Sequence, residues 1–169
     1  MHIGGIALLK GPPPPYVELL AHIRSRLHLV PRYRQRLTPV PLGQGRPVWT
    51  DDPHFNLRYH LRHTGLPAPG GPEELKALAG RLFSQRLDRN RPLWEIWLVD
   101  GLADGGFALV GKTHHALVDG VSGVDITTVL FDVSPDPAPV PPPAQAWVPK
   151  PPPSGAQLIA DALVERATV

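Results

Sequence analysis

Residues 107–120 read FALVGKTHHALVDG, a β-rich run that ends in two adjacent histidines and is followed by an aspartate–glycine pair. The run at Trp94–Val99 is also rich in aromatic and β-branched residues, and the segment between the two runs contains Asp104-Gly105. Two such runs joined by a short segment with a turn dipeptide are typical of a β-hairpin. The sequence therefore predicts a hairpin of residues 94–99 and 107–112, with the histidines directly after its second strand.

The spacing of apolar residues predicts the other elements. A short apolar run predicts a strand over His2–Leu9, because Gly11 and four prolines follow it. Alternation of apolar and polar residues predicts a second strand over residues 55–62 with one solvated face. Apolar residues three or four apart predict helices from Tyr16 to Val30, from Pro72 to near Asp88, and over Val121–Phe131.

Length and composition suggest one modest core and a short C-terminal extension. The chain has 169 residues, of which 42% are hydrophobic. Ten of the nineteen residues at 135–153 are proline, which favours an extended, semi-rigid linker. An amphipathic helix is expected over residues 157–167. We therefore expect a subdomain at 1–132, a linker at 133–154, and, at 155–169, the start of a helix that leads to a C-terminal subdomain absent from this chain.

Several classes of function are disfavoured by composition. The chain has no cysteine, which removes disulfides, thiolate nucleophiles and cysteine-bound metals. No apolar run reaches the roughly 20 residues that cross a bilayer, so a cytoplasmic protein is expected. The region from Arg24 to Arg62 has eight arginines against Asp51 and Asp52. This basic surface would suit CoA phosphates or anionic lipid, or it is simply a solvated face. Without interleaved exposed aromatics or a recognisable reading helix, nucleic acid is a poor third choice.

The histidine pair is the clearest candidate for chemistry. Successive side chains on an extended strand point to opposite faces, so we expect one histidine to face inward and the other to face a cleft. A neutral imidazole suits proton transfer near neutral pH because its ordinary pKa is about 6.5. Asp119 would hold the local geometry, and Gly120 would permit a tight turn. By itself, however, a His-His dipeptide is more often a structural or incidental feature.

Two other patterns do not support a site. Residues 120–124, GVSGV, place the second glycine one position too early for the nucleophile elbow of a serine hydrolase. His60 and His63 would lie on opposite faces of the strand predicted over residues 55–62, so no metal site is expected there.

Residues 114–120, HHALVDG, match the HHxxxDG motif and resemble the CoA-dependent acyltransferase superfamily, which includes chloramphenicol acetyltransferase-like enzymes and peptide-synthetase condensation domains. Three further runs occur in a similar order and spacing in a narrower family: MHIGG at 1–5, PRYRQRL at 31–37 and LDRNRPLWE at 87–95. Together they resemble the N-terminal part of bacterial wax ester synthase/diacylglycerol acyltransferases. The resemblance implies an α+β fold, namely the N-terminal half of a chloramphenicol acetyltransferase-like two-layer α/β sandwich.

The resemblance also implies a reaction, which is transfer of a fatty acyl group from acyl-CoA to diacylglycerol or a long-chain alcohol. His115 would be the general base and would face the cleft, with His114 turned inward as its support. Asp119 would be held by Arg34, or by Arg36 as second choice. Pro92, Leu93 and Trp94 would lie near the substrate passage.

The same resemblance implies no cofactor besides acyl-CoA as co-substrate, no metal, and peripheral contact with a membrane or lipid droplet as an open possibility. Two alternatives remain at this point. The chain could be a noncatalytic fragment or interaction module that needs a partner half. It could also be another acyltransferase such as a condensation domain, which would work with carrier-protein modules.

Overall fold

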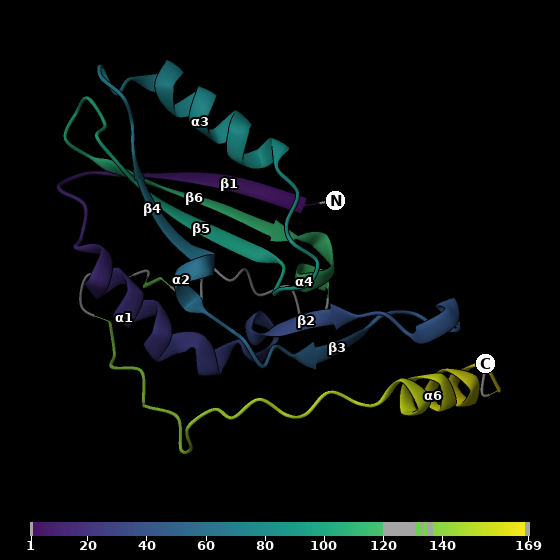
Figure 1. The fold of residues 1–169 in the computed structure, drawn as a ribbon. Helices are drawn as coiled ribbons and strands as arrows, with labels where there is room; N and C mark the ends of the chain where they lie inside the picture. The colour runs from purple at the N-terminus through teal and green to yellow at the C-terminus, as the bar shows by residue number, and fades with distance from the viewer. Residues whose placement is uncertain (1, 120–130, 133, 135–136, 168–169) are drawn as a thin grey trace.

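A four-stranded sheet in the order β1-β6-β5-β4 forms the centre of the fold (Figure 1). Its strands are β1 (His2–Leu9), β4 (Leu61–Gly65), β5 (Trp94–Asp100) and β6 (Phe107–His114). Strand β6 is antiparallel to both β1 and β5, whereas β4 and β5 are parallel. The predicted hairpin and the predicted first strand are confirmed.

This computed structural model describes residues 2–119, 131–132, 134 and 137–167, without the side chains of residues 118 and 119. Its helices are α1 (Tyr16–Arg26), α2 (Leu57–His60), α3 (Pro72–Ser84), α4 (His115–Asp119) and α6 (Gly155–Ala167), with short 3-10 helices η1 (Leu27–Leu29), η2 (Pro31–Arg34) and η3 (Pro41–Gly43). A small antiparallel sheet, which the sequence pattern did not predict, pairs β2 (Gln35–Thr38) with β3 (Val48–Asp51). The α+β class is confirmed. The helix predicted over Val121–Phe131 lies, apart from its last residue, outside the described residues.

Helices cover both faces of the central sheet (Figure 1). On one face, Val99, Ala108 and Val110 pack against three leucines of α3. On the other face, Ile96 and Leu98 join a larger cluster that includes Leu20 and Ile23 of α1. Alternate residues of β5 and β6 therefore belong to different cores, because successive side chains on a strand point to opposite sides.

The strand predicted over residues 55–62 is wrong. Residues 57–60 form the helical turn α2, and strand β4 begins only at Leu61. The Asn56 side chain accepts the backbone N–H of Arg58 at 3.0 Å, a local capping bond that favours a helical start. Leu57, His60 and Leu61 are all buried, so the segment also has the three-and-four spacing of a helix.

The helices predicted from Tyr16, from Pro72 and over residues 157–167 are confirmed, with shifts at their ends. Helix α1 ends at Arg26 and continues as η1, so helical structure stops before Pro31 as expected. Helix α3 ends at Ser84, earlier than the predicted Asp88, because Gln85 takes an extended backbone. Residues 137–153 contain neither helix nor strand, and α6 follows them.

The C-terminal segment contacts the body of the fold at several places. Leu158 and Ala162 of α6 pack against Val40. The Trp147 ring meets Phe55 edge-on with a centroid separation of 6.2 Å. The backbone N–H of Lys150 donates to Asp51 Oδ2 at 2.9 Å. The proposed division into subdomain, linker and helix remains a prediction, but the linker lies against the subdomain at these points.

His60 is a buried titratable group in the larger core. Its exposed fraction is 0%, and its ring stacks on Trp94 with a centroid distance of 4.7 Å. Nδ1 donates to the Trp94 carbonyl oxygen at 2.8 Å, while Nε2 has no hydrogen-bond partner among the described residues. Burial lowers the pKa of His60 from 6.5 to about 4, so the folded protein holds this imidazole neutral.

We expect His60 to make folding sensitive to mild acid. Since its pKa is lowered in the folded state, its contribution is fully present above pH 6.5 and is lost as the pH falls toward about 4. That interval corresponds to about 3 kcal/mol of unfolding free energy. Urea denaturation between pH 7.5 and 4.5 should show this loss in the parent, and His60→Phe should flatten it. A control substitution at the exposed His54, His54→Gln, should leave it in place; an unchanged pH dependence in His60→Phe would contradict the assignment.

Gly4 and Gly5 give a second test, because they are adjacent in β1 but point to opposite faces. A Cβ on Gly4 would overlap the Phe83 ring of α3, whereas one on Gly5 would meet nothing within 4 Å. Gly4→Ala should therefore destabilise the fold by about 1–3 kcal/mol through overpacking. Gly5→Ala is the matched control and should be neutral or slightly stabilising. Thermal and urea unfolding measure both, and equal losses in the two variants would disprove this packing.

Candidate active site

The histidine pair lies where the central strand β6 passes into the short helix α4. His114 is the last residue of β6, and His115 is the first residue of α4; both are half-buried. The His114 backbone N–H donates to the Leu93 carbonyl oxygen at 2.9 Å, and its Cα partner across the sheet is His2. The position of the pair is thus fixed by backbone pairing with β1 and with the residues that precede β5.

His114 acts as a cap for the helix that begins at His115. Its Nδ1 accepts the backbone N–H of Ala116 at 3.2 Å, which satisfies a donor in the first turn of α4. Burial lowers the pKa of His114, and electrostatic interactions with the amino terminus, Arg89, His2 and His115 lower it further. A neutral imidazole is the form that can accept this bond, so capping and electrostatics agree.

Alternation would place the two histidines on opposite faces only if the strand continued through His115. The structure ends β6 at His114, so the alternation rule does not extend to His115. The orientation of His115 toward a cleft therefore remains a prediction that rests on the motif.

Two other motif residues lie at the limit of what is described. The backbone of Asp119 closes α4, but its side chain, like the whole of Gly120, lies outside the described residues. The two arginines predicted to pair with Asp119 have other contacts. The Arg34 guanidinium lies 4.6 Å from the centroid of the Trp147 ring, and Arg36 Nη1 donates to the Asn90 carbonyl oxygen at 3.4 Å. Burial lowers the pKa of Arg34. Pairing of Asp119 with either arginine stays a prediction.

Pro92, Leu93 and Trp94 are buried, at the start of strand β5 beside β6. Trp94 is only 1% exposed, and its Nε1 donates to the Tyr33 carbonyl oxygen at 2.8 Å. Leu93 supplies the carbonyl that accepts the His114 N–H. Leu93 and Trp94 therefore pair through their backbones with the strand that carries the histidines, and contact of the three residues with a substrate remains a prediction.

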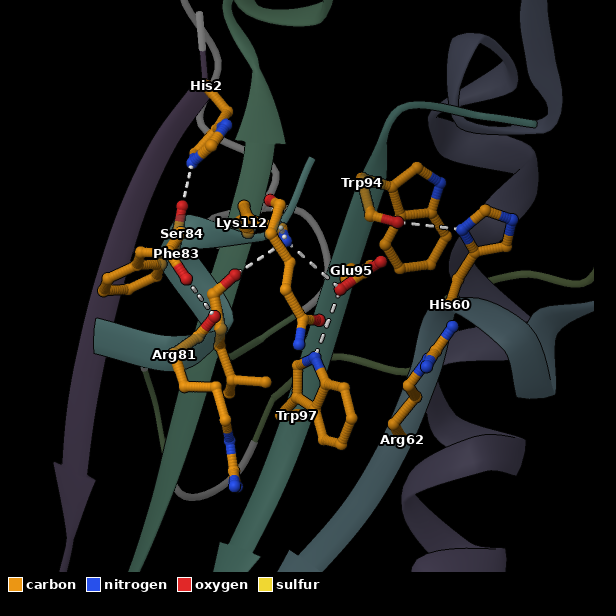
Figure 2. A network of polar contacts seen from close by, with 12 residues as sticks. His2, His60, Arg62, Arg81, Phe83, Ser84, Trp94, Glu95, Trp97 and Lys112 are labelled. Carbon is orange, nitrogen blue, oxygen red and sulfur yellow. Dashed lines mark hydrogen bonds and ion pairs between the residues drawn. The ribbon is translucent and has the colours of Figure 1, made fainter. Parts of the chain in front are cut away.

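Sequence reasoning missed a buried ion pair close to this site. Lys112 of β6 is 2% exposed, and its Nζ lies 3.5 Å from Glu95 Oε2 of β5 (Figure 2). The Trp97 indole N–H donates to the same carboxylate oxygen at 3.3 Å. The alternation of residues along β6 could have predicted that Lys112 is buried, because Lys112 lies on the same face of the strand as the buried Ala108 and Val110.

His60 and His63, the two histidines considered for a metal site, do not form one. His60 belongs to the core, whereas the exposed His63 places Nε2 2.7 Å from Asp100 Oδ2. Among the residues that the structure describes, no group of three His, Asp or Glu side chains could hold a metal ion. None of the described helices is long and apolar enough to span a bilayer.

Two clefts lie along α3, and both include residues at the end of the sheet opposite the histidines: Leu66 follows β4, and Leu102 follows β5. The first is lined by residues that include Leu66, Glu74 and Arg81, and the second by residues that include Ile6 and Leu8. Leu8 pairs with Ala108, six positions before His114, which is about 20 Å along a strand. We therefore do not assign either cleft to the histidine site.

The chain matches the catalytic-domain model of wax ester synthase/diacylglycerol acyltransferases over residues 1–168. A probable diacylglycerol O-acyltransferase of Mycobacterium tuberculosis is 40% identical over 161 residues, covering 94% of this chain and 59% of that protein. A putative diacylglycerol O-acyltransferase of the same organism is 45% identical over 139 residues, covering 82% of this chain and 29% of the relative.

Solved structures share the fold. The wax ester synthase/diacylglycerol acyltransferase of Marinobacter aquaeolei is 39% identical with a TM-score of 0.57, covering 72% of this chain and 31% of that one. The first condensation domain of the calcium-dependent antibiotic synthetase has a TM-score of 0.55 at 22% identity, over 68% of this chain and 27% of that one, which shows fold likeness alone. The predicted acyltransferase-type fold is thereby confirmed.

The chain spans only part of each of these proteins, from 59% of the first mycobacterial protein to 27% of the condensation domain. The family itself is shown by the match over nearly the whole chain. This chain belongs to the wax ester synthase/diacylglycerol acyltransferase catalytic domain family.

Proposed function

We propose that this chain contributes the general base to an O-acyltransferase that moves a fatty acyl group from acyl-CoA to the hydroxyl of diacylglycerol or a long-chain alcohol. The observation that carries the proposal is the HHALVDG motif at the junction of β6 and α4, in a chain of this family. That junction presents two half-buried imidazoles at the end of a strand fixed on both sides.

His115 is the base in this proposal. Its imidazole takes the proton of the acceptor hydroxyl while the hydroxyl oxygen attacks the thioester carbonyl carbon. When the tetrahedral intermediate collapses, the carbon–sulfur bond breaks and the imidazolium returns its proton to the departing CoA thiolate. The products are the new ester and CoA, so no covalent enzyme intermediate and no cofactor besides the co-substrate are required.

The contacts of His114 support this division of roles. Its Nδ1 already accepts a backbone N–H from α4, and burial together with nearby positive charge lowers its pKa. Through this hydrogen bond, the His114 imidazole holds the first turn of α4. The general-base role then falls to the adjacent His115, as the resemblance of HHALVDG to the HHxxxDG motif implies.

The basic N-terminal region supports acyl-CoA as donor. Arginines attract the phosphates of CoA at long range, and the same charges would favour contact with an anionic lipid surface. Part of this region is also used in packing, since Arg32 lies 4.9 Å from the centroid of the Trp49 ring. Peripheral contact with a membrane or lipid droplet, and a cytoplasmic location, belong to this proposal.

The test uses a chimera in which this chain replaces the segment that it matches in the Marinobacter enzyme. With labelled acyl-CoA and either diacylglycerol or a long-chain alcohol, the chimera should form triacylglycerol or wax ester. His115→Ala should reduce transfer by about 10²–10⁴-fold, the usual contribution of a general base, with circular dichroism unchanged.

His54→Ala, at an exposed histidine outside the site, is the matched control and should retain full transfer. Undiminished transfer in His115→Ala would remove the base assignment. A folded chimera without transfer to either acceptor would contradict the proposed function and favour a noncatalytic interaction module.

A further inference from the structure

Lys112 is a buried charge for which the proposed chemistry has no direct use. It lies on β6, two positions before His114, on the face that packs against α3. A buried ammonium group is costly unless it is paired and hydrogen-bonded, and here it is both.

The partners of Lys112 lie at the carboxyl end of α3. Nζ donates to the carbonyl oxygens of Leu82 at 2.9 Å and Gln85 at 3.0 Å, and Glu95 Oε2 lies 3.5 Å away (Figure 2). The last carbonyls of a helix have no partner within the helix and carry partial negative charge. The ammonium group therefore caps α3, and Glu95 balances its charge.

The capped end of α3 is connected to His114 by two further contacts. His2, the Cα partner of His114, donates from Nε2 to the Phe83 carbonyl oxygen at 2.7 Å (Figure 2). The segment 85–93, which leaves the end of α3, returns to the site where the Leu93 carbonyl oxygen accepts the His114 N–H. Both ends of this segment are thus bonded to β6, one through Lys112 and one through His114.

We propose that Lys112, with Glu95 as its counter-ion, is a positioning residue that holds the end of α3 and the segment 85–93 against β6 and so fixes the surroundings of His114. Only the description of the histidine pair as an active site rests on the proposed function. The bonds themselves belong to the fold and can be tested without turnover.

The titration of His114 reports on this arrangement. The charged or titratable groups around it are His2 on β1, Arg89 on segment 85–93, His115 on α4 and the amino terminus. Burial and these charges lower the pKa of His114. If the segment is released, the imidazole becomes more hydrated and Arg89 moves away, and both changes raise that pKa.

The experiment is a histidine titration by NMR on this chain, with the His114 signal assigned by its loss in His114→Gln. The test variant is Lys112→Met with Glu95→Gln, which removes both buried charges together and keeps an acceptor for Trp97, so the fold should persist. The expected result is an upward shift of the His114 pKa together with faster amide exchange in residues 85–93.

The matched control is Lys76→Met with Glu73→Gln, an exposed ion pair on the same helix with an Nζ–Oε1 distance of 2.7 Å. It should change neither the His114 pKa nor the exchange rates. A folded Lys112/Glu95 variant whose His114 titrates as in the parent would overturn the proposal.

A second variant avoids the buried pair altogether. Arg89 and Arg86 are both exposed on the segment, but only Arg89 acts on His114. Arg89→Gln should raise the His114 pKa, and the control Arg86→Gln should not. If Arg89→Gln leaves the His114 pKa unchanged, segment 85–93 does not lie beside His114, and the proposal is overturned. This result can be obtained even if the Lys112/Glu95 variant does not fold. In either outcome, the proposed acyl transfer is judged separately by the chimera assay.

Discussion

Backbone pairing along the whole length of β6 is the constraint on which the rest of the structure depends. All eight of its residues, Phe107–His114, pair with β1, and most of them also pair with β5 on the other side. A strand held on both edges cannot slip by one residue without exchanging its two faces. This pairing decides which side chains meet α3, which meet the larger core, and where the chain leaves the sheet at His114.

The free-energy cost of burying polar groups explains much of the arrangement around His114, where the chain leaves the sheet. Lys112 is accommodated because the end of α3 presents carbonyl oxygens to it and Glu95 lies nearby. His60 is accommodated in a different way, as a neutral ring that stacks on Trp94 and donates to its carbonyl. Both groups contact the region just before or within β5, so the residues that support His114 are held by polar bonds as well as by apolar packing.

Backbone pairing of β6 holds the first histidine of the motif, and the family is shown by a match over residues 1–168 of this chain. The relatives are longer, and this chain spans 31% of the Marinobacter enzyme. Within the described residues, Pro92, Leu93 and Trp94 are buried rather than open to a passage. Their place near a substrate passage remains a prediction, and the chimera assay tests acyl transfer.

The sequence by itself determined the elements whose patterns are local. The hairpin of β5 and β6, the first strand, and helices α1, α3 and α6 all follow from periodicity and turn residues, and the motif at 114–120 identified the superfamily. What only the tertiary structure decided are the features that depend on distant partners. Residues 57–61 satisfy both strand and helix spacing. The local Asn56 cap favours a helical start, but the burial of Leu57 and His60 against the core depends on distant residues. Likewise, nothing near Lys112 in the sequence reveals that the end of α3 will cap it, because those carbonyls lie about thirty residues earlier in the chain and meet it only when the sheet has formed.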